Sequence, residues 1–552
     1  MIAKRDLISV VVLSLVFFLM ATWALGNYNV PQSTWQSKGG ETFYVDLGSV
    51  KNVSQVYLLL KQGSIIVDVY TGHPEEWSLK TTVSFGDYYR WEGIQIDTET
   101  EFVRFAFQIS DGEIAEISAL DSDGRRITIQ AVGSEDHQDN NLTRLIDEQQ
   151  EVECPPTYQS ETYFDEIYYV RTAEDYLNLR QPYEWTHPPL GKLIIAGGIY
   201  VFGENPFSWR IAGVIFATLM IPAIYLLGKK MFGTWIGAFA PAFLLMFDFM
   251  HFTMARIATI DTFVVFFSIL SQLFFFAYVK NVLTEGWRTS TRPLFLAVLF
   301  FALGFSTKWY VLFGFLGQTV ILLVLRLREL SVFKGRVMRA RAFFSRPFSS
   351  LFVFLAISAG IYVLTFVPYM IIGHSLMDVY QAQWSMFNYH STLSATHPFS
   401  SQWWTWPLIS RPVWLYVSEL PGGIVSTIAA MGNPAVWWIG FASIILAVEE
   451  AVRTRNRVCL FLVTIFFFQW LPYALISRTL FLYHFYFNVP IMILATVYFI
   501  NKSWRTRQGK AIVLVYLILV AAVFVLFYPV ISGMPIPFYW RNGLRWFRSW
   551  VF

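Results

Sequence analysis

The sequence is poor in cysteine and in charge. Only two of its 552 residues are cysteine, Cys154 in a polar stretch and Cys459 at the end of an expected helix, which argues against a disulfide framework. Charged residues make up 14% of the chain, against roughly 25% in soluble domains. The formal net charge is +3, too small to indicate nucleic acid as a partner.

The sequence also lacks histidines at the spacing of a metal site. The histidines after residue 370 do not recur at the H-x-x-x-H interval that places two ligands on one helix face. They are His374, His390, His397 and His484. Asp121 and Asp123 reproduce the DxD pattern of metal-dependent sugar transferases, but they stand in an expected hairpin, where turn chemistry accounts for them. We therefore expect neither a metal nor another cofactor.

Apolar runs of membrane-spanning length dominate what is present. Hydrophobic residues make up 55% of the chain and the mean hydropathy is +0.46. The runs predict a polytopic α-helical membrane protein with about eleven transmembrane helices. The first helix, within residues 1–27, has no convincing cleavage site and is expected to remain. The others form a core over 206–530, at residues 211–227, 235–252, 262–279, 293–305, 311–327, 351–372, 436–448, 458–473, 486–500 and 511–528.

Residues 32–132 follow a different pattern. Short segments alternate apolar and polar residues between glycine-containing turns, which is typical of a β-sandwich of about 100 residues. The pattern is similar to galactose-binding-like sandwiches, although no motif identifies one. We interpret the acidic, polar stretch 133–157 as a linker.

The basic residues predict the orientation of the helices. The positive-inside rule places the N-terminus and five basic turns in the cytoplasm. These turns are residues 229–230, 280–292, 326–346, 453–457 and 502–510. This orientation requires that the short apolar run 190–203 does not cross the membrane. We therefore expect this run to lie along the outer membrane interface. The sandwich, a loop over 158–205 and the tail 531–552 then lie on the extracytoplasmic or lumenal side.

This topology gathers unusual polar residues at the outer face. The segment from Thr162 to Lys192 opens on the pair Asp165-Glu166 and ends in HPPLGK, whose prolines fix a turn. A charge at membrane depth costs about 2.5–3.5 kcal/mol at a helix centre, so it indicates a function. Cations beside carboxylates favour an anionic, membrane-held ligand such as a lipid phosphate.

Six segments resemble the protein O-mannosyltransferase family, within the C-type (GT-C) glycosyltransferases. They are HPPLGK after the Asp-Glu pair, ARIATID (Ala255–Asp261), GFSTKW (Gly304–Trp309), the stretch Tyr389–Trp414, GNPAVWW (Gly432–Trp438) and RTLFLYHFYFNVP (Arg478–Pro490). The resemblance implies eleven spans and a mannose donor on a polyprenyl or dolichyl phosphate. It also implies transfer to Ser or Thr hydroxyls of proteins, with inversion and without metal. Eukaryotic members carry a β-trefoil in a later outer loop, whereas this sequence has its sandwich before the Asp-Glu pair.

The resemblance also implies roles for single residues. Asp165 is the expected catalytic base for the acceptor hydroxyl, and Glu166 either positions the acceptor backbone or holds a cation. The phosphate leaving group needs cations rather than an acid. The candidates for binding it are His187, Arg210, Arg256, Lys308 and Arg478. Further expected substrate contacts are Asp261, His390, His397, Arg411 and His484.

Structural explanations compete with these roles. The Asp165-Glu166 pair is also compatible with a solvated helix cap. Arg210 and Arg256 are compatible with the snorkelling ends of spans, and Arg256 with a structural pair to Asp261.

Other functions compete with protein mannosylation. One keeps the fold and donor class but takes a lipid or polysaccharide acceptor, as aminoarabinose and arabinosyl transferases do. Another is a non-enzymatic lipid-phosphate transporter or carbohydrate-binding receptor, which would need no base at Asp165. Membrane lipids are partners in every case, and the sequence does not indicate an oligomeric state.

Overall fold

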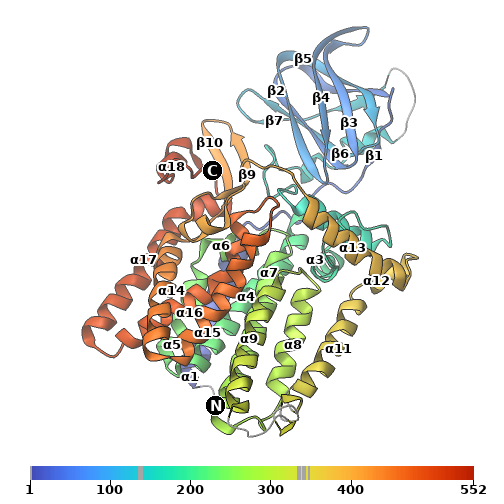
Figure 1. Cartoon of the computed structure of the whole chain (residues 1–552). Helices are drawn as coiled ribbons and strands as arrows, with labels where there is room; N and C mark the ends of the chain where they lie inside the picture. The colour runs from blue at the N-terminus through green and yellow to red at the C-terminus, as the bar shows by residue number, and fades with distance from the viewer. Residues whose placement is uncertain (1–2, 135–140, 332–336, 339–342, 346–347) are drawn as a thin grey trace.

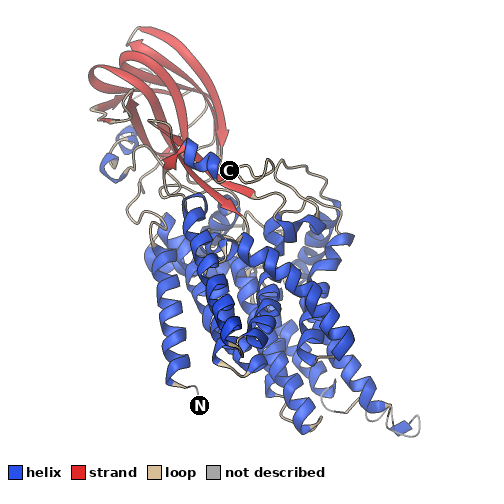
Figure 2. Ribbon diagram, turned by 90° about the vertical axis from the view of Figure 1, so that its left-hand side faces the viewer, coloured by secondary structure: helices blue, strands red, loops and turns tan. Residues whose placement is uncertain are grey.

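The computed structural model describes the chain except residues 1–2, 135–140, 332–336, 339–342 and 346–347. Most basic residues of the 326–346 loop therefore lie outside the described residues. A helical bundle carries a β-rich domain at one end (Figures 1 and 2). The N-terminus lies at the opposite end of the bundle, and the C-terminus lies on the side of the β-rich domain (Figure 1).

Apolar helices build the bundle of this integral, multi-pass membrane protein. They are α1 (Lys4–Thr22), α4 (Pro206–Phe232), α5 (Trp235–Met246), α6 (Phe249–Ala255), α7 (Asp261–Glu285), α8 (Arg292–Phe305), α9 (Val311–Leu330), α11 (Phe348–Leu364), α14 (Pro434–Thr454), α15 (Arg457–Trp470), α16 (Val489–Ser503) and α17 (Arg507–Ser532). In the described chain eight spans meet the length and apolarity of a membrane crossing. A ninth arises if α5 and α6, bent by 59°, count as one. Since α8 and α11 have only 14 and 17 residues, the predicted count of eleven is not established.

Helix α4 shows how the sequence sets these boundaries. Asn205 accepts a hydrogen bond from the backbone N–H of Ser208 at 2.8 Å, and Pro206 fits the first turn, where no N–H is needed. The helix ends at Gly233, whose φ of +73° favours glycine. Lys229 and Lys230 in the last turn complement the helix dipole.

The basic turns lie together at the N-terminal end of the bundle. Lys229 pairs with Asp6 at 2.9 Å, and Lys280 Nζ donates to the Lys230 carbonyl at 3.1 Å. The Arg326 guanidinium stacks 4.8 Å from the ring centroid of Trp287. This clustering agrees with the predicted common side for these turns.

Helix α3 (Leu190–Phe202) does not cross the bundle. Its first residue donates from N–H to the carbonyl of Ser306, just after α8, at 3.1 Å. Just beyond its end, Glu204 pairs with Lys61 of the β-rich domain at 2.7 Å. Both ends of α3 thus lie on the side of that domain, as the sequence predicts.

The β-rich domain is an antiparallel sheet folded into two layers. Its strands are β1 (Trp35–Gln36), β2 (Thr42–Gln62), β3 (Ser64–His73), β4 (Glu76–Gly86), β5 (Arg90–Ser110), β6 (Glu113–Asp121), β7 (Arg126–Ile127) and β8 (Ala131–Gly133). The order is β1-β6-β2-β5-β3-β4, with β7 beside β6 and β8 beside β2. The 21-residue strands β2 and β5 run through both layers and shift register on the way. Alternating side chains fill the interior, as in the predicted sandwich.

Residues 142–145 pack into the domain rather than forming a linker. Leu142 and Leu145 are buried in the domain core. Both stand in the short 3₁₀ helix Leu142–Leu145. Two leucines three positions apart inside a polar stretch were the sequence signal for this packing, so the linker predicted over 133–157 is too long.

Smaller elements complete the face below the domain. Helix α2 (Glu166–Leu177) follows the Asp-Glu pair, and α12 (Val367–Ile371) and α13 (Leu376–Thr392) follow α11. A three-stranded sheet has the order β11-β10-β9, formed by β9 (Val413–Leu420), β10 (Ile424–Ala430) and β11 (Ile536–Pro537). Helix α18 (Phe538–Gly543) follows it.

Candidate active site

The backbone presents the Asp165 carboxylate without using it as a cap. Phe164, just before it, has φ +52°, a left-handed conformation that costs on the order of 1–3 kcal/mol for a bulky residue. Asp165 occupies the N-cap position of α2, but its side chain makes no capping hydrogen bond. The contact that would make this residue a helix cap is therefore missing, and the carboxylate lines a cavity instead.

Glu166 has its contacts inside the protein. Its oxygens accept two hydrogen bonds from Arg210, at 2.8 and 2.7 Å, and both side chains are fully buried. The backbone N–H groups of Tyr163 and Ala258 donate to the same carboxylate at 3.1 and 2.8 Å. Of the two roles expected for Glu166, these contacts fit holding a cation.

The HPPLGK turn is held by a carboxylate that the sequence reasoning missed. Lys192 Nζ donates to Glu184 Oε2 at 2.6 Å and to the carbonyl of His187 at 2.7 Å. The other oxygen of Glu184 lies 3.0 Å from His187 Nδ1. Burial raises the pKa of Glu184, but Lys192 and His187 outweigh it and hold that pKa below its usual range. A glutamate three residues before the histidine was the available signal.

Seven of the expected site residues line one cavity of about 670 Å³. They are Asp165, His187, Lys308, His390, His397, Arg478 and His484. The aromatic side chains of Tyr168, Tyr169 and Tyr483 complete much of its wall. The segments that meet here are separated by up to about 300 positions in the sequence, and the bundle brings them together.

A second cavity, of about 540 Å³, has a more apolar wall. Trp309, Leu312, Phe313, Leu475 and Ile476 line it. Leu312 and Leu475 are exposed at the bundle surface, where lipid chains would lie. The two cavities share Thr186, His187, Lys308, His390, Arg478 and His484. The cationic side chains thus stand where a polar space meets an apolar one.

The two cations that both cavities share, Lys308 and Arg478, have different partners. Lys308 Nζ lies 3.0 and 3.1 Å from the two oxygens of Asp261, which places Asp261 directly behind the cavity wall. Arg478 instead donates to His390 Nδ1 at 2.7 Å, and His390 Nε2 donates to the carbonyl of Thr186 at 2.8 Å. No carboxylate in the described part of the chain pairs with Arg478, so it is best placed to attract an anion.

Arg210 and Arg256 do not fit the expected role at the donor phosphate. Besides Glu166, Arg210 donates to backbone carbonyls, among them Tyr158 and Glu161 at 2.7 Å. Arg256 donates to the carbonyls that end α1, those of Ala21, Trp23 and Ala24, at 2.6–2.8 Å. Neither arginine lines the two cavities. Both fasten the end of α1 and the loop before α2.

Two further expectations are not met: Arg411 does not line the cavity of Asp165, and Arg256 does not pair with Asp261. Arg411 lines a neighbouring cavity of about 820 Å³. This cavity shares five residues with the cavity of Asp165: Leu393, Ala395, Thr396, Arg478 and Thr479. Arg256 binds backbone carbonyls and Asp261 binds Lys308, so the two do not pair. Arg411 therefore lies beside the main cavity rather than in it.

The raised pKa of the Asp165 carboxyl group suits a general base. Burial raises its pKa to about 7, Lys308 lowers it, and the carboxylates of Asp261 and Glu184 raise it. A carboxylate with this pKa is a stronger proton acceptor than an exposed aspartate, and about half of it is ionised at pH 7. By contrast, burial lowers the pKa of His187, which favours its neutral form.

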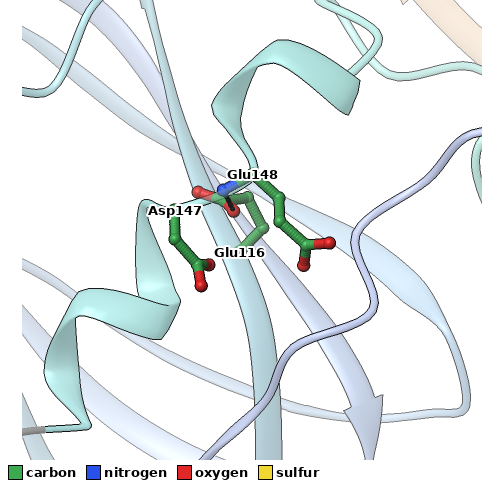
Figure 3. Close-up of side chains that lie close together, drawn as sticks. All are labelled: Glu116, Asp147 and Glu148. Atoms are coloured by element: carbon green, nitrogen blue, oxygen red, sulfur yellow. Dashed lines mark hydrogen bonds between the residues drawn. The ribbon is translucent and has the colours of Figure 1, made fainter.

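Glu116, Asp147 and Glu148 lie close together in the β-rich domain (Figure 3), with one oxygen of each within 4.8 Å of the others. Over the described ranges this is the one group of three or more potential metal ligands. Its oxygens already accept protein hydrogen bonds: Glu116 from the Glu148 backbone at 3.0 Å, and Glu148 from the backbones of Gln32 and Ser33 at 2.7 Å. The group lies outside both cavities, so metal independence of the chemistry stays a prediction.

Two family models match the chain. The model described as "Dolichyl-phosphate-mannose-protein mannosyltransferase" matches residues 186–340, and "C-terminal four TMM region of protein-O-mannosyltransferase" matches residues 375–550. The chain belongs to the protein O-mannosyltransferase family. This confirms the family that the six sequence segments indicate.

Similar proteins and structures support this membership in the protein O-mannosyltransferases. A polyprenol-phosphate-mannose–protein mannosyltransferase of Corynebacterium glutamicum is 25% identical over 430 residues, which are 66% of this chain and 81% of that protein. The protein of the same name from Mycobacterium tuberculosis is 26% identical over 429 residues, 66% and 80% of the two chains. The Pmt1-Pmt2 complex of S. cerevisiae bound to the sugar donor matches with a TM-score of 0.60 at 12% identity, over 71% of this chain and 89% of that one. This match shows a common GT-C fold.

Proposed function

We propose that this protein O-mannosyltransferase moves mannose from a polyprenyl or dolichyl phosphate to Ser or Thr hydroxyls of proteins. One observation carries the proposal: a polar cavity with Asp165 and an apolar cavity meet at a common set of cations. The apolar cavity suits the lipid chain, and the cations suit its phosphate. The relatives named above, which carry this activity in their names, support the same donor and acceptor.

The proposed reaction follows from this arrangement. The acceptor hydroxyl oxygen attacks C1 of mannose on the face opposite the phosphate, and its proton passes to the carboxylate of Asp165. The bond from C1 to the phosphate oxygen breaks, and the phosphate leaves with the electron pair. Arg478, with Lys308 beside it, stabilises the charge on that leaving group. Attack opposite the leaving group inverts the configuration at C1.

The same arrangement favours an orientation. The basic turns lie at the N-terminal end of the bundle, and the cavities lie at the other end. The positive-inside rule would place the N-terminus in the cytoplasm. The site would then act on the extracytoplasmic or lumenal side.

Membranes containing the protein test the activity directly. With radiolabelled polyprenyl-phosphate mannose and a Ser/Thr-rich peptide, we expect label on the peptide, and none when its Ser and Thr are replaced by alanine. Label in lipid or polysaccharide alone would support the alternative acceptors instead. Unchanged donor under all conditions would support a transporter or receptor.

We expect the rate to depend on pH through Asp165. The base must be ionised to accept a proton, and its pKa is raised to about 7. Below pH 7, kcat/KM should therefore fall towards tenfold per pH unit, and above pH 8 it should level off. The measurement is kcat/KM for the peptide from pH 5 to 9. A flat profile over this range, in a protein that stays folded, would contradict the role of Asp165.

We expect transfer without a divalent metal. Arginine, lysine and histidine side chains line the proposed phosphate site. Of the carboxylates near it, Glu184 and Asp261 are bound to lysines of the protein, and Asp165 alone is not a ligand set. Activity in excess EDTA should stay within about twofold of the untreated protein, since no metal-ligand set is expected there. Loss of activity that Mg²⁺ or Mn²⁺ restores would overturn this expectation.

A further inference from the structure

A fourth cavity lies between the β-rich domain and the helical bundle. Its volume is about 360 Å³. Four parts of the chain line it: the β-rich domain, the loop before Asp165, the loop residue Phe399, and strand β9, which lies beside the domain in Figure 1. The lining residues used below are Tyr57, Arg90, Trp91, Glu161, Phe164, Phe399, Trp414, Tyr416 and Val417.

This cleft adjoins the cavity that contains Asp165. Phe164 lines both spaces, and Asp165 is the next residue of the chain. Likewise, Phe399 lines the cleft and His397, two residues earlier, lines the Asp165 cavity. A chain that lies in the cleft therefore has a short path to the proposed base.

The cleft runs along an unpaired strand edge. Strand β9 pairs with β10 on one side and ends the described three-stranded sheet on the other. The five consecutive residues from Trp414 to Ser418 all line the cleft. Since side chains alternate between the faces of a strand, a space that touches every residue faces the strand edge. Such an edge offers backbone N–H and C=O groups to an added strand.

The other walls suit an extended polypeptide. Aromatic rings from all four parts of the chain, Trp91, Phe164, Phe399 and Trp414 among them, can pack on its side chains. Arg90, half exposed, and the carboxylate of Glu161 add one charge of each sign. Arg90 already pairs with Asp87 at 2.7 Å, and Glu161 accepts from the Trp91 backbone. A strand-like ligand with mixed side chains matches these walls, whereas a lipid chain would leave the strand edge without partners.

The walls are held in place before any ligand binds. The backbone N–H of Thr162 donates to the carbonyl of Tyr89 at 2.9 Å, and that of Trp91 donates to Glu161 Oε2 at 3.0 Å. At the far end of β9, a Cβ at Gly124 would stand 2.5 Å from Pro421 Cγ, so the domain also touches the β9–β10 turn. The geometry is that of a preformed site.

We propose that this cleft binds the acceptor polypeptide in an extended conformation along β9, next to the Ser or Thr that enters the Asp165 cavity. The β-rich domain would then select acceptors through residues on one side of the modified position. This inference rests on the proposed function and adds the site at which its protein acceptor is held.

Steady-state kinetics of Arg90→Ala and Tyr57→Ala test the cleft. For an acceptor polypeptide of twenty or more residues, we expect KM to rise roughly five- to tenfold, the size of one lost interface contact. For a peptide of three to five residues, which fills only the Asp165 cavity, KM should stay unchanged. Lys80→Ala, an exposed change on β4, is the matched control. Equal effects on both acceptors, or none, would overturn the proposal.

Cross-linking separates this proposal from the proposed function. A photoreactive residue at Val417, which is exposed at the cleft, should capture the long polypeptide, and one at the exposed Leu79 on β4 should not. The experiment uses the Asp165→Asn background, so capture needs no transfer. Capture at Val417, without any mannose transfer by the parent protein, would contradict the proposed function but support the proposal that the cleft binds a polypeptide. Mannose transfer by the parent protein, without capture at Val417, would contradict only the proposal that the cleft binds the acceptor.

Discussion

Replacing Asp165 with asparagine should lower kcat for mannose transfer by about 10²–10⁴-fold, the usual contribution of a general base. Asparagine has nearly the same shape but accepts no proton under these conditions. Because the Asp165 side chain makes no capping hydrogen bond, the substitution should leave the unfolding temperature nearly unchanged. Donor binding should also stay close to that of the parent protein, because the base acts on the transition state rather than on the bound donor.

The matched control is Asp123→Asn, which changes an exposed carboxylate of the β-rich domain. It should retain full activity. The residual rate of the Asp165 variant should lose the pH dependence that centres near pH 7. Retention of a tenth or more of the parent kcat, or an unchanged pH profile, would show that another group accepts the proton.

The sequence predicted the site better than it predicted the roles of single residues. Periodicity and basic turns placed the loops of Asp165, Lys308, His390 and Arg478 on one side, and the bundle brings these side chains to one cavity. This convergence was predictable because apolar runs and basic turns depend on local composition, which the sequence contains.

Partner choice in the interior could not be predicted in the same way. Arg210 and Arg256 look like phosphate ligands in the sequence, but their donors bind Glu166 and backbone carbonyls from segments far away in the chain. Which buried carbonyls lack other partners depends on how helix ends pack, and composition does not report that. Glu184 was missed for the same reason, because its role in holding the HPPLGK turn depends on its contacts with Lys192 and His187.

The β-rich domain shows a similar limit. Alternation predicted its strands, but not the layers that β2 and β5 connect or the packing of Leu142 and Leu145. Nor did it predict the hydrogen bond from Thr162 to Tyr89, which ties the domain to the loop before Asp165. Contacts between distant strands and loops follow from register and shape, which are global properties.

Replacing Glu166 with alanine should lower the free energy of unfolding by about 3–5 kcal/mol, because it leaves a fully buried Arg210 without its carboxylate. Two backbone N–H groups, of Tyr163 and Ala258, lose their acceptor in the same step. Glu166→Gln, which keeps one acceptor oxygen, should destabilise less. The measurement is the thermal unfolding of the purified protein in detergent.

Activity per folded molecule then separates a structural Glu166 from a catalytic one. If Glu166 holds Arg210 and the loop before α2, Glu166→Gln should keep most of the parent kcat while its unfolding temperature falls. Glu449→Ala is the matched control, since it breaks the exposed pair with Arg453, whose atoms lie 2.8 Å apart, and should change the unfolding temperature little. A Glu166→Gln protein as stable as the parent but inactive would instead place this carboxylate in the chemistry beside Asp165.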